Sequence, residues 1–384
     1  MSDEKKYIYL DSAATASSEK FQILDNFANP NSVHDAGRDS FNVLEGSRET
    51  IAQLIGAKRP SEIIFTSGAT EANNMAIFGI SRAFADLRNL RSKKSSKKPR
   101  VIVSAIEHES IIIPAKELMH EGFDVKFAPV DKYGFIKEQM FENLLTDETV
   151  LVSIQASNTE IGSIQNLKPL IDKTHVAGAL FHSDFVGSLG RTSFDVSELG
   201  LDAASFSGHK IGTPKGIGFL FLKSKTPFKP LIFGSGQEGG LRGGTQNVAL
   251  AASLKHALEF SCKNLDAQVS QFNSFKYKII NSVQGLDGVR ITVDDKSERF
   301  LPSILHLVFK KFTSETLILK YGEFGIEVSG GPACSSESNE PSHVLKAISV
   351  DKSEINGAVR LSFSEFNNEK EIDAFLHATK QILG

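Results

Sequence analysis

The sequence predicts an α/β protein built on a mainly parallel β-sheet with helices on both faces. Short runs of β-branched and apolar residues, typical of buried strands, occur at residues 62–65, 101–103, 150–154, 180–182 and 218–222. Segments with helical periodicity separate them at residues 47–54, 71–90, 110–121 and 167–177. Such alternation indicates parallel βαβ units. Ligands bind at the carboxyl ends of the strands in these sheets, so we expect functional residues directly after each run.

A change in pattern near residue 262 predicts a second, smaller α+β domain. Beyond this point the chain has longer amphipathic segments and only a few strand-like runs, such as residues 303–309 and 358–363. A chain of 384 residues is long enough for one large core and a second one. We expect a large domain over residues 16–261 and a small domain formed by residues 1–15 and 262–384.

Composition argues against several classes of protein. The formal net charge is -3, so the basic excess typical of nucleic-acid-binding proteins is absent. No apolar run is long enough to span a bilayer, and the charged N-terminus lacks the apolar core of a signal peptide. The two cysteines, Cys262 and Cys334, fit neither a zinc pattern nor a disulfide framework. We therefore expect a cytoplasmic protein with no metal, nucleic-acid or membrane partner.

A lysine in a polar, glycine-bearing turn is the first candidate for chemistry. Lys210 follows the segment Ser205 to His209 and precedes several glycines, including Gly212. A lysine that forms a Schiff base needs a fixed, mostly buried position and a lowered pKa, because only its neutral amine is nucleophilic. Ser207 and His209 would flank it as hydrogen-bond donors to a phosphate. The alternative is an ordinary surface lysine in a loop.

Asp184 strengthens this interpretation, because it comes soon after the expected strand at residues 180–182. Pyridoxal 5′-phosphate (PLP) needs a carboxylate on its pyridinium nitrogen so that the ring acts as an electron sink. Asp184 precedes Lys210 by 26 residues, which is one strand–helix–strand excursion. We therefore predict a PLP enzyme with its cofactor on Lys210. A turn or N-cap aspartate is the alternative for Asp184.

Two further segments follow expected strands. Thr66 to Asn74 opens a helix with small and hydroxyl residues, and the free N–H groups of a helix N-terminus bind phosphate. The same residues could instead serve only as a helix cap. His108 follows the strand at residues 101–103 and could stack on a flat ring or shuttle protons. A lone histidine is more often a satisfied loop or core residue.

The glycine-rich run Gly234 to Gly239 formally matches GxGxxG but does not predict a dinucleotide site. The acidic residue expected about twenty positions later would be Glu259, which lies within a helical pattern rather than at a strand end. The neighbouring run Gly243 to Thr245 is the better candidate for a phosphate loop.

Cys334 and Arg360 complete the candidates. Cys334 lies among small, polar residues, which gives a nucleophilic thiol the access it needs, whereas Cys262 has the pattern of a buried, inert cysteine. Arg360 lies in the expected strand at residues 358–363 and could clamp a substrate carboxylate with two hydrogen bonds. A structural ion pair is the alternative for Arg360.

Together these residues resemble cysteine desulfurases of the NifS/IscS kind, in the class-V branch of PLP-dependent aminotransferase-fold enzymes. The resemblance covers nearly the whole chain. It is carried by residues 9–15, 29–34, 65–71, 158–162, 206–211, 241–245, 329–338 and 358–362. It implies the aspartate aminotransferase-like fold (fold type I), with a seven-stranded, mainly parallel sheet in the large domain and the catalytic cysteine loop in the small α+β domain.

The resemblance also implies an activity: a homodimer converts L-cysteine to L-alanine and passes the sulfur, as a persulfide on Cys334, to an acceptor protein. The acceptor would be an iron–sulfur scaffold, a tRNA-thiolation enzyme or a carrier. The implied catalytic residues are Lys210, Cys334 and His108, and the implied substrate-binding residues are Arg360 and Asn31. The implied cofactor-binding residues are Ala69, Thr70, His108, Thr159, Asp184, Ser207, His209, Lys210 and Thr245, the last from the other subunit.

Three positions depart from the family pattern. Thr159 stands where the family usually has asparagine, Gly187 where it has glutamine, and Pro332 where serine is typical. Two hydrogen bonds near the cofactor ring would be lost, at a cost of about 1 kcal/mol each. These departures keep two alternatives open: a selenocysteine lyase or other PLP β-elimination enzyme, and a degenerate PLP-fold partner in sulfur-cluster assembly.

Overall fold

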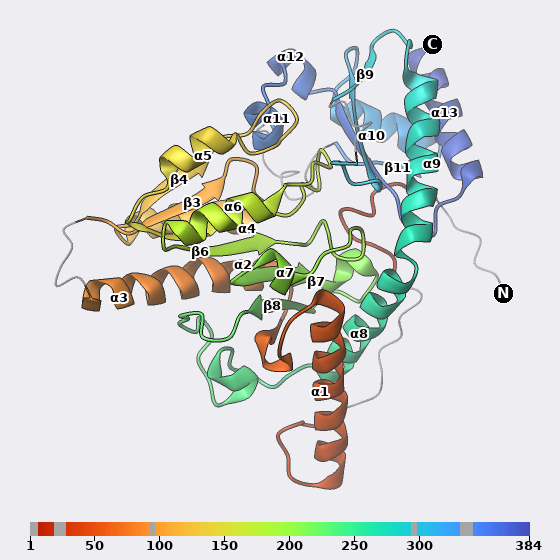
Figure 1. Ribbon diagram of the computed structural model, residues 1–384. Helices are drawn as coiled ribbons and strands as arrows, with labels where there is room; N and C mark the ends of the chain where they lie inside the picture. The colour runs from red at the N-terminus through yellow and green to blue at the C-terminus, as the bar shows by residue number, and fades with distance from the viewer. Residues whose placement is uncertain (1–6, 19–27, 92–96, 293–297, 331–340) are drawn as a thin grey trace.

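The computed structural model describes residues 7–18, 28–91, 97–292, 298–330 and 341–384. Its largest element is a seven-stranded sheet in the order β2–β8–β7–β6–β5–β3–β4 (Figure 1). The strands are β2 (Ile63–Thr66), β3 (Arg100–Ser104), β4 (Asp124–Ala128), β5 (Thr149–Ser153), β6 (Leu180–Asp184), β7 (Ala203–Ser207) and β8 (Gly218–Leu222). Strand β8 is antiparallel to both neighbours and all other pairs are parallel, which confirms the predicted mainly parallel sheet.

Helices cover both faces of this sheet. Strands β5 and β8 are buried at every residue, as expected where both faces are covered. One face packs on α1 (Asp35–Ile55), α5 (Glu138–Leu144), α6 (Leu167–Val176), α7 (Val196–Leu199) and α8 (Val248–Lys263). The other packs on α2 (Ala69–Asn74), the π-helical turn Met75–Ile80, α3 (Ser81–Arg91) and α4 (Glu109–His120). Within the described ranges, no helix has the length and apolarity needed to cross a membrane.

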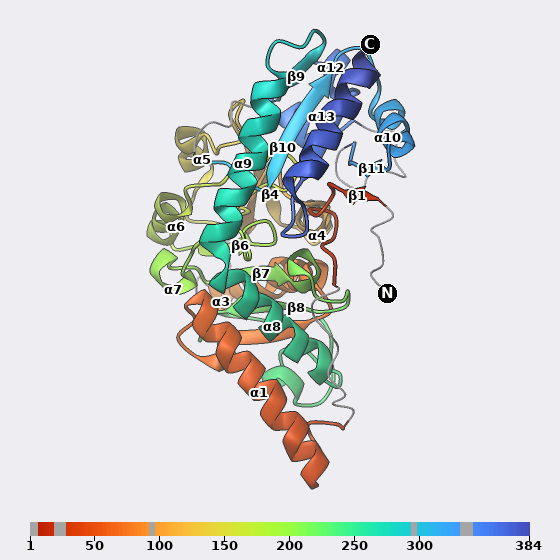
Figure 2. The same cartoon turned by 90° about the vertical axis from the view of Figure 1, so that its right-hand side faces the viewer.

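A second core forms around an antiparallel sheet of three strands in the order β12–β10–β9 (Figure 2). The strands are β9 (Val289–Ile291), β10 (Ile304–Phe309) and β12 (Ala358–Ser362), and they pack with α9 (Leu265–Val283), α10 (Ser314–Glu323) and α13 (Glu369–Leu383). Strand β1 (Ile8–Tyr9) pairs in parallel with β11 (Ile326–Glu327), so the start of the chain joins this core. The short helices α11 (His343–Ala347) and α12 (Lys352–Ile355) pack instead against the first core.

Candidate active site

Asp184 ends β6 and lies in a buried hydrogen-bond network. Its Oδ1 accepts from the backbone N–H of Val186 at 2.9 Å, and its Oδ2 accepts from Nδ2 of Asn73 at 2.8 Å. The same Asn73 nitrogen donates to Ser110 Oγ at 2.9 Å. Asn73 is fully buried in α2, and its Oδ1 has no partner among the described residues. Donors on both oxygens hold the Asp184 carboxylate in a fixed place.

His108 is the N-cap of α4 and connects to the same network. Its Nδ1 accepts from the backbone N–H of Ser110 at 3.1 Å and lies 2.8 Å from the Ser110 hydroxyl. Because Nδ1 accepts, the neutral ring carries its proton on Nε2. His108 is exposed, yet desolvation by the surrounding protein lowers its pKa. The negative charge of Asp184 raises this pKa, and the positive charge of Lys210 lowers it further. The ring is therefore neutral, anchored and accessible.

Lys210 lies in the 3₁₀ turn Gly208–Ile211 that follows β7. Its Nζ donates to the backbone carbonyl of Ala14 at 2.8 Å and to that of Ala13. The Nδ1 atom of the neighbouring His209 lies 3.2 Å from Thr15 Oγ1. Burial, together with two nearby lysine charges, lowers the pKa of His209 to about 4. The segment after β1 therefore packs against the lysine turn and contacts the side chains of both Lys210 and His209.

Three of the predicted cofactor-binding residues, Ala69, Thr70 and Ser207, lie where β7 ends and α2 begins. Ser207 is the buried last residue of β7, while Ala69 and Thr70 form the first turn of α2, with Thr70 exposed. A Cβ at Gly218 of β8 would lie 2.7 Å from the Cα of Gly68. Only glycine at position 218 therefore lets the loop before α2 lie against the sheet beside Ser207.

Arg360 lies in β12 and reaches this site from the smaller core. Its Nη2 donates to Asp11 Oδ1 at 2.5 Å, and its Nη1 donates to the carbonyl oxygen of Thr159 at 3.2 Å. The Arg360 side chain is 4% exposed, and its Nε has no partner among the described residues. The ion pair that the sequence left as an alternative is therefore present, while one buried donor still lacks an acceptor.

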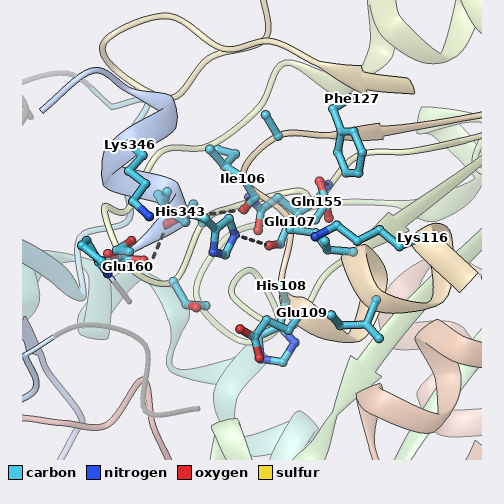
Figure 3. Close-up of a pocket in the computed structure, with 18 of the residues that line it drawn as sticks. Ile106, Glu107, His108, Glu109, Lys116, Phe127, Gln155, Glu160, His343 and Lys346 are labelled. Carbon is cyan, nitrogen blue, oxygen red and sulfur yellow. Dashed lines mark hydrogen bonds between the residues drawn. The ribbon is translucent and has the colours of Figure 1, made fainter. Parts of the chain in front are cut away.

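A cavity of about 460 Å³ lies between the loops after β3 and β5 and the start of α11 (Figure 3). His108, Thr159 and Arg360 line it, together with three glutamates that the sequence did not single out: Glu107, Glu109 and Glu160. A smaller cavity of about 20 Å³ lies at Lys210, and Thr159 and Gly187 line it. Thr159 borders both cavities and therefore stands at their junction.

Two of the three glutamates of the larger cavity, Glu107 and Glu160, are buried carboxyl groups with raised pKa values. Glu107 accepts from Ser104 Oγ at 2.5 Å and from the backbone N–H of Gln155 at 2.8 Å. Burial raises the pKa of Glu107 to about 8 against the effect of these hydrogen bonds. Burial likewise raises the pKa of Glu160 to about 7. Among the described residues, neither oxygen of Glu160 and only one oxygen of Glu107 has a hydrogen-bond partner.

Two of the departures from the family pattern fit one another. A Cβ at Gly187 would lie 2.6 Å from Ser157 Oγ and 2.9 Å from Thr159 Cγ2. Both distances are shorter than ordinary van der Waals contact, so a side chain at position 187 would displace its neighbours. Thr159 and Gly187 therefore form one packed contact beside the cavity at Lys210.

Asn31 and Thr245 line neither of these cavities. Asn31 precedes α1, and its Nδ2 donates to Gln246 Oε1 at 3.1 Å. Thr245, the residue before Gln246, is exposed. Buried Glu238 anchors the loop that carries Thr245: it accepts from Arg48 at 2.7 and 2.9 Å and from the backbone N–H of Phe65 at 2.8 Å. The φ angle of Glu238 is 48°, a left-handed conformation that these hydrogen bonds maintain.

The predicted nucleophile Cys334, and the departure at Pro332, lie outside the described residues. Beyond that segment, residues 341–344 line the larger cavity, and His343 Nε2 lies 2.9 Å from the carbonyl oxygen of Glu107. The expectation that Cys262 is buried is wrong. Cys262 is exposed on α8, where the preceding residue, Ser261, faces the core.

Comparison with known proteins places the chain in a family. Residues 8–375 match the family model described as Aminotransferase class-V. Cysteine desulfurase IscS 1 from Archaeoglobus fulgidus is 35% identical over 94% of this chain and 91% of its own length. A solved structure named NifS-like protein has a TM-score of 0.86 at 32% identity, covering 98% of this chain and 99% of that chain. Another, "SspA in complex with cysteine", has a TM-score of 0.78 at 31% identity, covering 94% and 100%.

The sheet topology and the polar groups at its strand ends define a PLP-dependent enzyme of fold type I. More particularly, the chain belongs to the aminotransferase class-V family, whose members use pyridoxal phosphate. The predicted family, fold and cofactor are thereby confirmed.

Proposed function

We propose that this chain is a cysteine desulfurase, which converts L-cysteine to L-alanine and takes up the sulfur on Cys334. The observation that carries this proposal is the convergence of Lys210, Asp184 and His108 at the strand ends, with Arg360 lining the same cavity as His108. The relatives support the choice of substrate, because one is named a cysteine desulfurase and another holds cysteine.

The described residues fit pyridoxal phosphate. Asp184 is a buried acceptor at a strand end, and Lys210 is a primary amine held in the turn after the neighbouring strand. Ser207, His209 and Thr70 would hold the phosphate. When bound, the cofactor supplies an electron sink for the charge that develops at the substrate α-carbon.

Each side chain has a task that its surroundings suit. Lys210 Nζ would accept the α-proton of the substrate, and Asp184, held in place by Asn73, would pair with the ring nitrogen. The neutral, accessible ring of His108 would stack on the cofactor. Arg360 would bind the substrate carboxylate, since its planar guanidinium matches a carboxylate with two N–H groups.

Sulfur transfer in this reaction needs no external oxidant. The Cys334 thiolate attacks the substrate sulfur, the bond between that sulfur and Cβ breaks, and Cβ takes up a proton. A thiol and L-cysteine thereby give a persulfide and L-alanine, with atoms and electrons balanced. The outer sulfur then passes to an acceptor protein, which we expect to be a cytoplasmic iron–sulfur scaffold, thiolation enzyme or carrier.

A homodimer would explain the residues that lie apart from the cavities. Asn31 and Thr245 would complete the site of the second subunit, because they line neither cavity of their own chain. Near them in sequence, the apolar side chains of Val33 and Phe233 are 86% and 84% exposed, and a second copy would cover them. Light scattering should then give a mass twice the 41.8 kDa of one chain.

Mass spectrometry after incubation with L-cysteine tests the proposed reaction. We expect a mass gain of one sulfur atom on Cys334 and release of alanine in the presence of a reductant. Cys334→Ala should abolish both, while Cys262→Ala, which removes the other thiol, should keep both. Undiminished alanine release by Cys334→Ala would contradict the assignment of the nucleophile.

A selenocysteine lyase or another β-elimination enzyme is the second candidate, favoured by the Thr159–Gly187 contact, which leaves both positions without an amide side chain. Comparing the turnover of cysteine, selenocysteine and cystine separates these activities. A degenerate PLP-fold partner would bind little cofactor. A yellow protein whose visible absorbance band is removed by borohydride would contradict that reading.

A further inference from the structure

Arg360 already holds one carboxylate. Its Nη2 donates to Asp11 Oδ1 at 2.5 Å, and the Arg360 side chain is only 4% exposed, so little water screens the pair. The two charges are therefore balanced before any substrate binds. A substrate carboxylate at Arg360 would bring a second negative charge to one buried cation. A third negative charge nearby would make the binding of that carboxylate still less favourable.

Glu160 lies near this pair, and the charge of Arg360 acts on its pKa. It directly follows Thr159, whose carbonyl oxygen accepts from Arg360 Nη1 at 3.2 Å. Both Glu160 and Arg360 line the larger cavity, in which Figure 3 labels Glu160. Glu160 is 3% exposed, and among the described residues its carboxyl oxygens have no partner in good hydrogen-bond geometry; the Ser342 side chain is the one donor near enough to lower its pKa. Burial of a carboxyl group that lacks well-placed donors favours its protonated form.

The polar and charged groups around Glu160 come from four parts of the chain. They are Ser342, His343 and Lys346 in and just before α11, Arg360 in β12, Asp11 after β1, and Glu107, His108, Glu109 and Lys116 in the loop after β3 and the helix α4 that it opens. Burial raises the pKa of Glu160 to about 7, while Ser342 and the charge of Arg360 lower it. Lys346 is exposed, and Glu107 has hydrogen-bond donors of its own.

We infer that Glu160 must carry a proton for the carboxylate of an amino-acid substrate to bind at Arg360. With Glu160 ionised, the substrate carboxylate, Asp11 and Glu160 would surround one guanidinium; with Glu160 protonated, only two negative charges remain. Glu160 is thus a positioning residue that sets the upper pH limit of carboxylate recognition. This inference rests on the proposed function, because it takes Arg360 as the substrate-carboxylate site.

The test compares L-alanine with ethylamine, which is alanine without its carboxylate, as ligands of the PLP-loaded protein. Calorimetry gives the dissociation constants of both ligands from about pH 6 to about pH 9. Titration of the ligand amines and of Lys210 changes both constants alike, so it cancels in their ratio. Above the Glu160 pKa of about 7, alanine should lose up to about tenfold in affinity relative to ethylamine per pH unit. In Glu160→Gln the ratio should stay constant.

Glu109→Gln is the matched control, because it removes an exposed carboxylate that lines the same cavity. It should keep the wild-type pH dependence. A ratio that still changes with pH in Glu160→Gln overturns the inference, and so does a constant ratio in the wild type.

A second readout needs no variant. Calorimetry of the wild type near the upper end of that pH range, in two buffers with different ionisation enthalpies, should show more proton uptake with alanine than with ethylamine. Equal uptake overturns the inference even if Glu160→Gln does not fold. If the wild type binds neither ligand at any pH, the proposed function itself fails, and the inference fails with it.

Discussion

The two sides of the strand-end site differ in how completely their polar groups are paired. On the side of the lysine turn, both oxygens of Asp184 accept hydrogen bonds and Lys210 donates to two carbonyls. On the cavity side, Arg360 Nε and both oxygens of Glu160 have no partners among the described residues. In the proposed function, the groups that would keep one geometry toward the cofactor are held by the protein, whereas the groups on the side proposed for the substrate carboxylate keep unused hydrogen-bonding capacity.

The largest expected effect concerns the paired side. Lys210→Ala removes the amine that would hold the cofactor and accept the α-proton, so alanine release should fall by about a thousandfold or more. The visible absorbance band of the loaded protein should shift or disappear. Lys215→Ala, an exposed lysine five residues on, is the control and should keep both properties. Retained turnover in Lys210→Ala would contradict the assignment of the lysine turn as the side that holds the cofactor.

Asn73→Ala tests whether the network around Asp184 is structural as well as functional. It removes the donor to Asp184 Oδ2 and to Ser110 Oγ, so urea denaturation should show a loss of about 1–3 kcal/mol in the free energy of unfolding. Asn74→Ala removes only a bond to the Thr70 carbonyl in the same helix and should cost less than about 1 kcal/mol. Equal losses of stability in the two variants would contradict the claim that the bonds from Asn73 to Asp184 and Ser110 stabilise the fold.

Gly187→Ala tests the junction between the two sides. Its methyl group would collide with Ser157 Oγ and Thr159 Cγ2, and such overpacking should destabilise the protein by about 1–3 kcal/mol. Thr159→Ser, which removes Cγ2, should recover part of this loss. Gly46→Ala in α1 meets no atom within 4 Å and should instead stabilise the protein by about 0.5–1 kcal/mol. Thermal or urea denaturation distinguishes the two signs.

Glu107→Gln should have the smallest effect, and its sign depends on pH. The folded-state pKa of about 8 lies above the usual value of 4.5, so the contribution of Glu107 to stability is present at low pH and is lost as the pH rises toward 8. Glutamine keeps an oxygen for the bonds from Ser104 and Gln155. The variant should match the wild type near about pH 5 and exceed it by roughly 1–2 kcal/mol near about pH 9. Lower stability at both pH values would contradict this account.

Local patterns were sufficient to place Asp184 and His108 at or after the ends of strands, because each follows an apolar run that forms a strand. Strand β7 was not predicted, because its sequence, Ala-Ala-Ser-Phe-Ser, consists mainly of small residues that carry no β-branched signal. Lys210 was nevertheless found, because its polar, glycine-bearing turn is distinctive. The helix predicted over residues 71–90 contains a π-helical turn at Met75–Ile80, which periodicity does not reveal.

Asn73, Glu107 and Glu160 could not be found from the sequence, because their burial depends on distant segments. Asn73 meets Asp184 across 111 residues of chain, and the two glutamates are enclosed only where α11 returns to the large sheet. A pattern within ten or fifteen residues carries no trace of such contacts. The roles of Cys334 and of the other site residues, and the domain limits at residues 16–261, stay predictions; α8 runs through the second limit without a break.

Glu238 has a consequence for assembly. Its bonds to Arg48 and Phe65 tie the Thr245 loop to α1 and β2 of the same chain, so the loop takes its shape as that chain folds. A second copy that docks there would meet a finished surface and would freeze few backbone rotations on contact. The left-handed backbone of Glu238, with φ at 48°, is stabilised by hydrogen bonds within one subunit. Contact between two subunits therefore does not have to supply the free energy that this conformation costs.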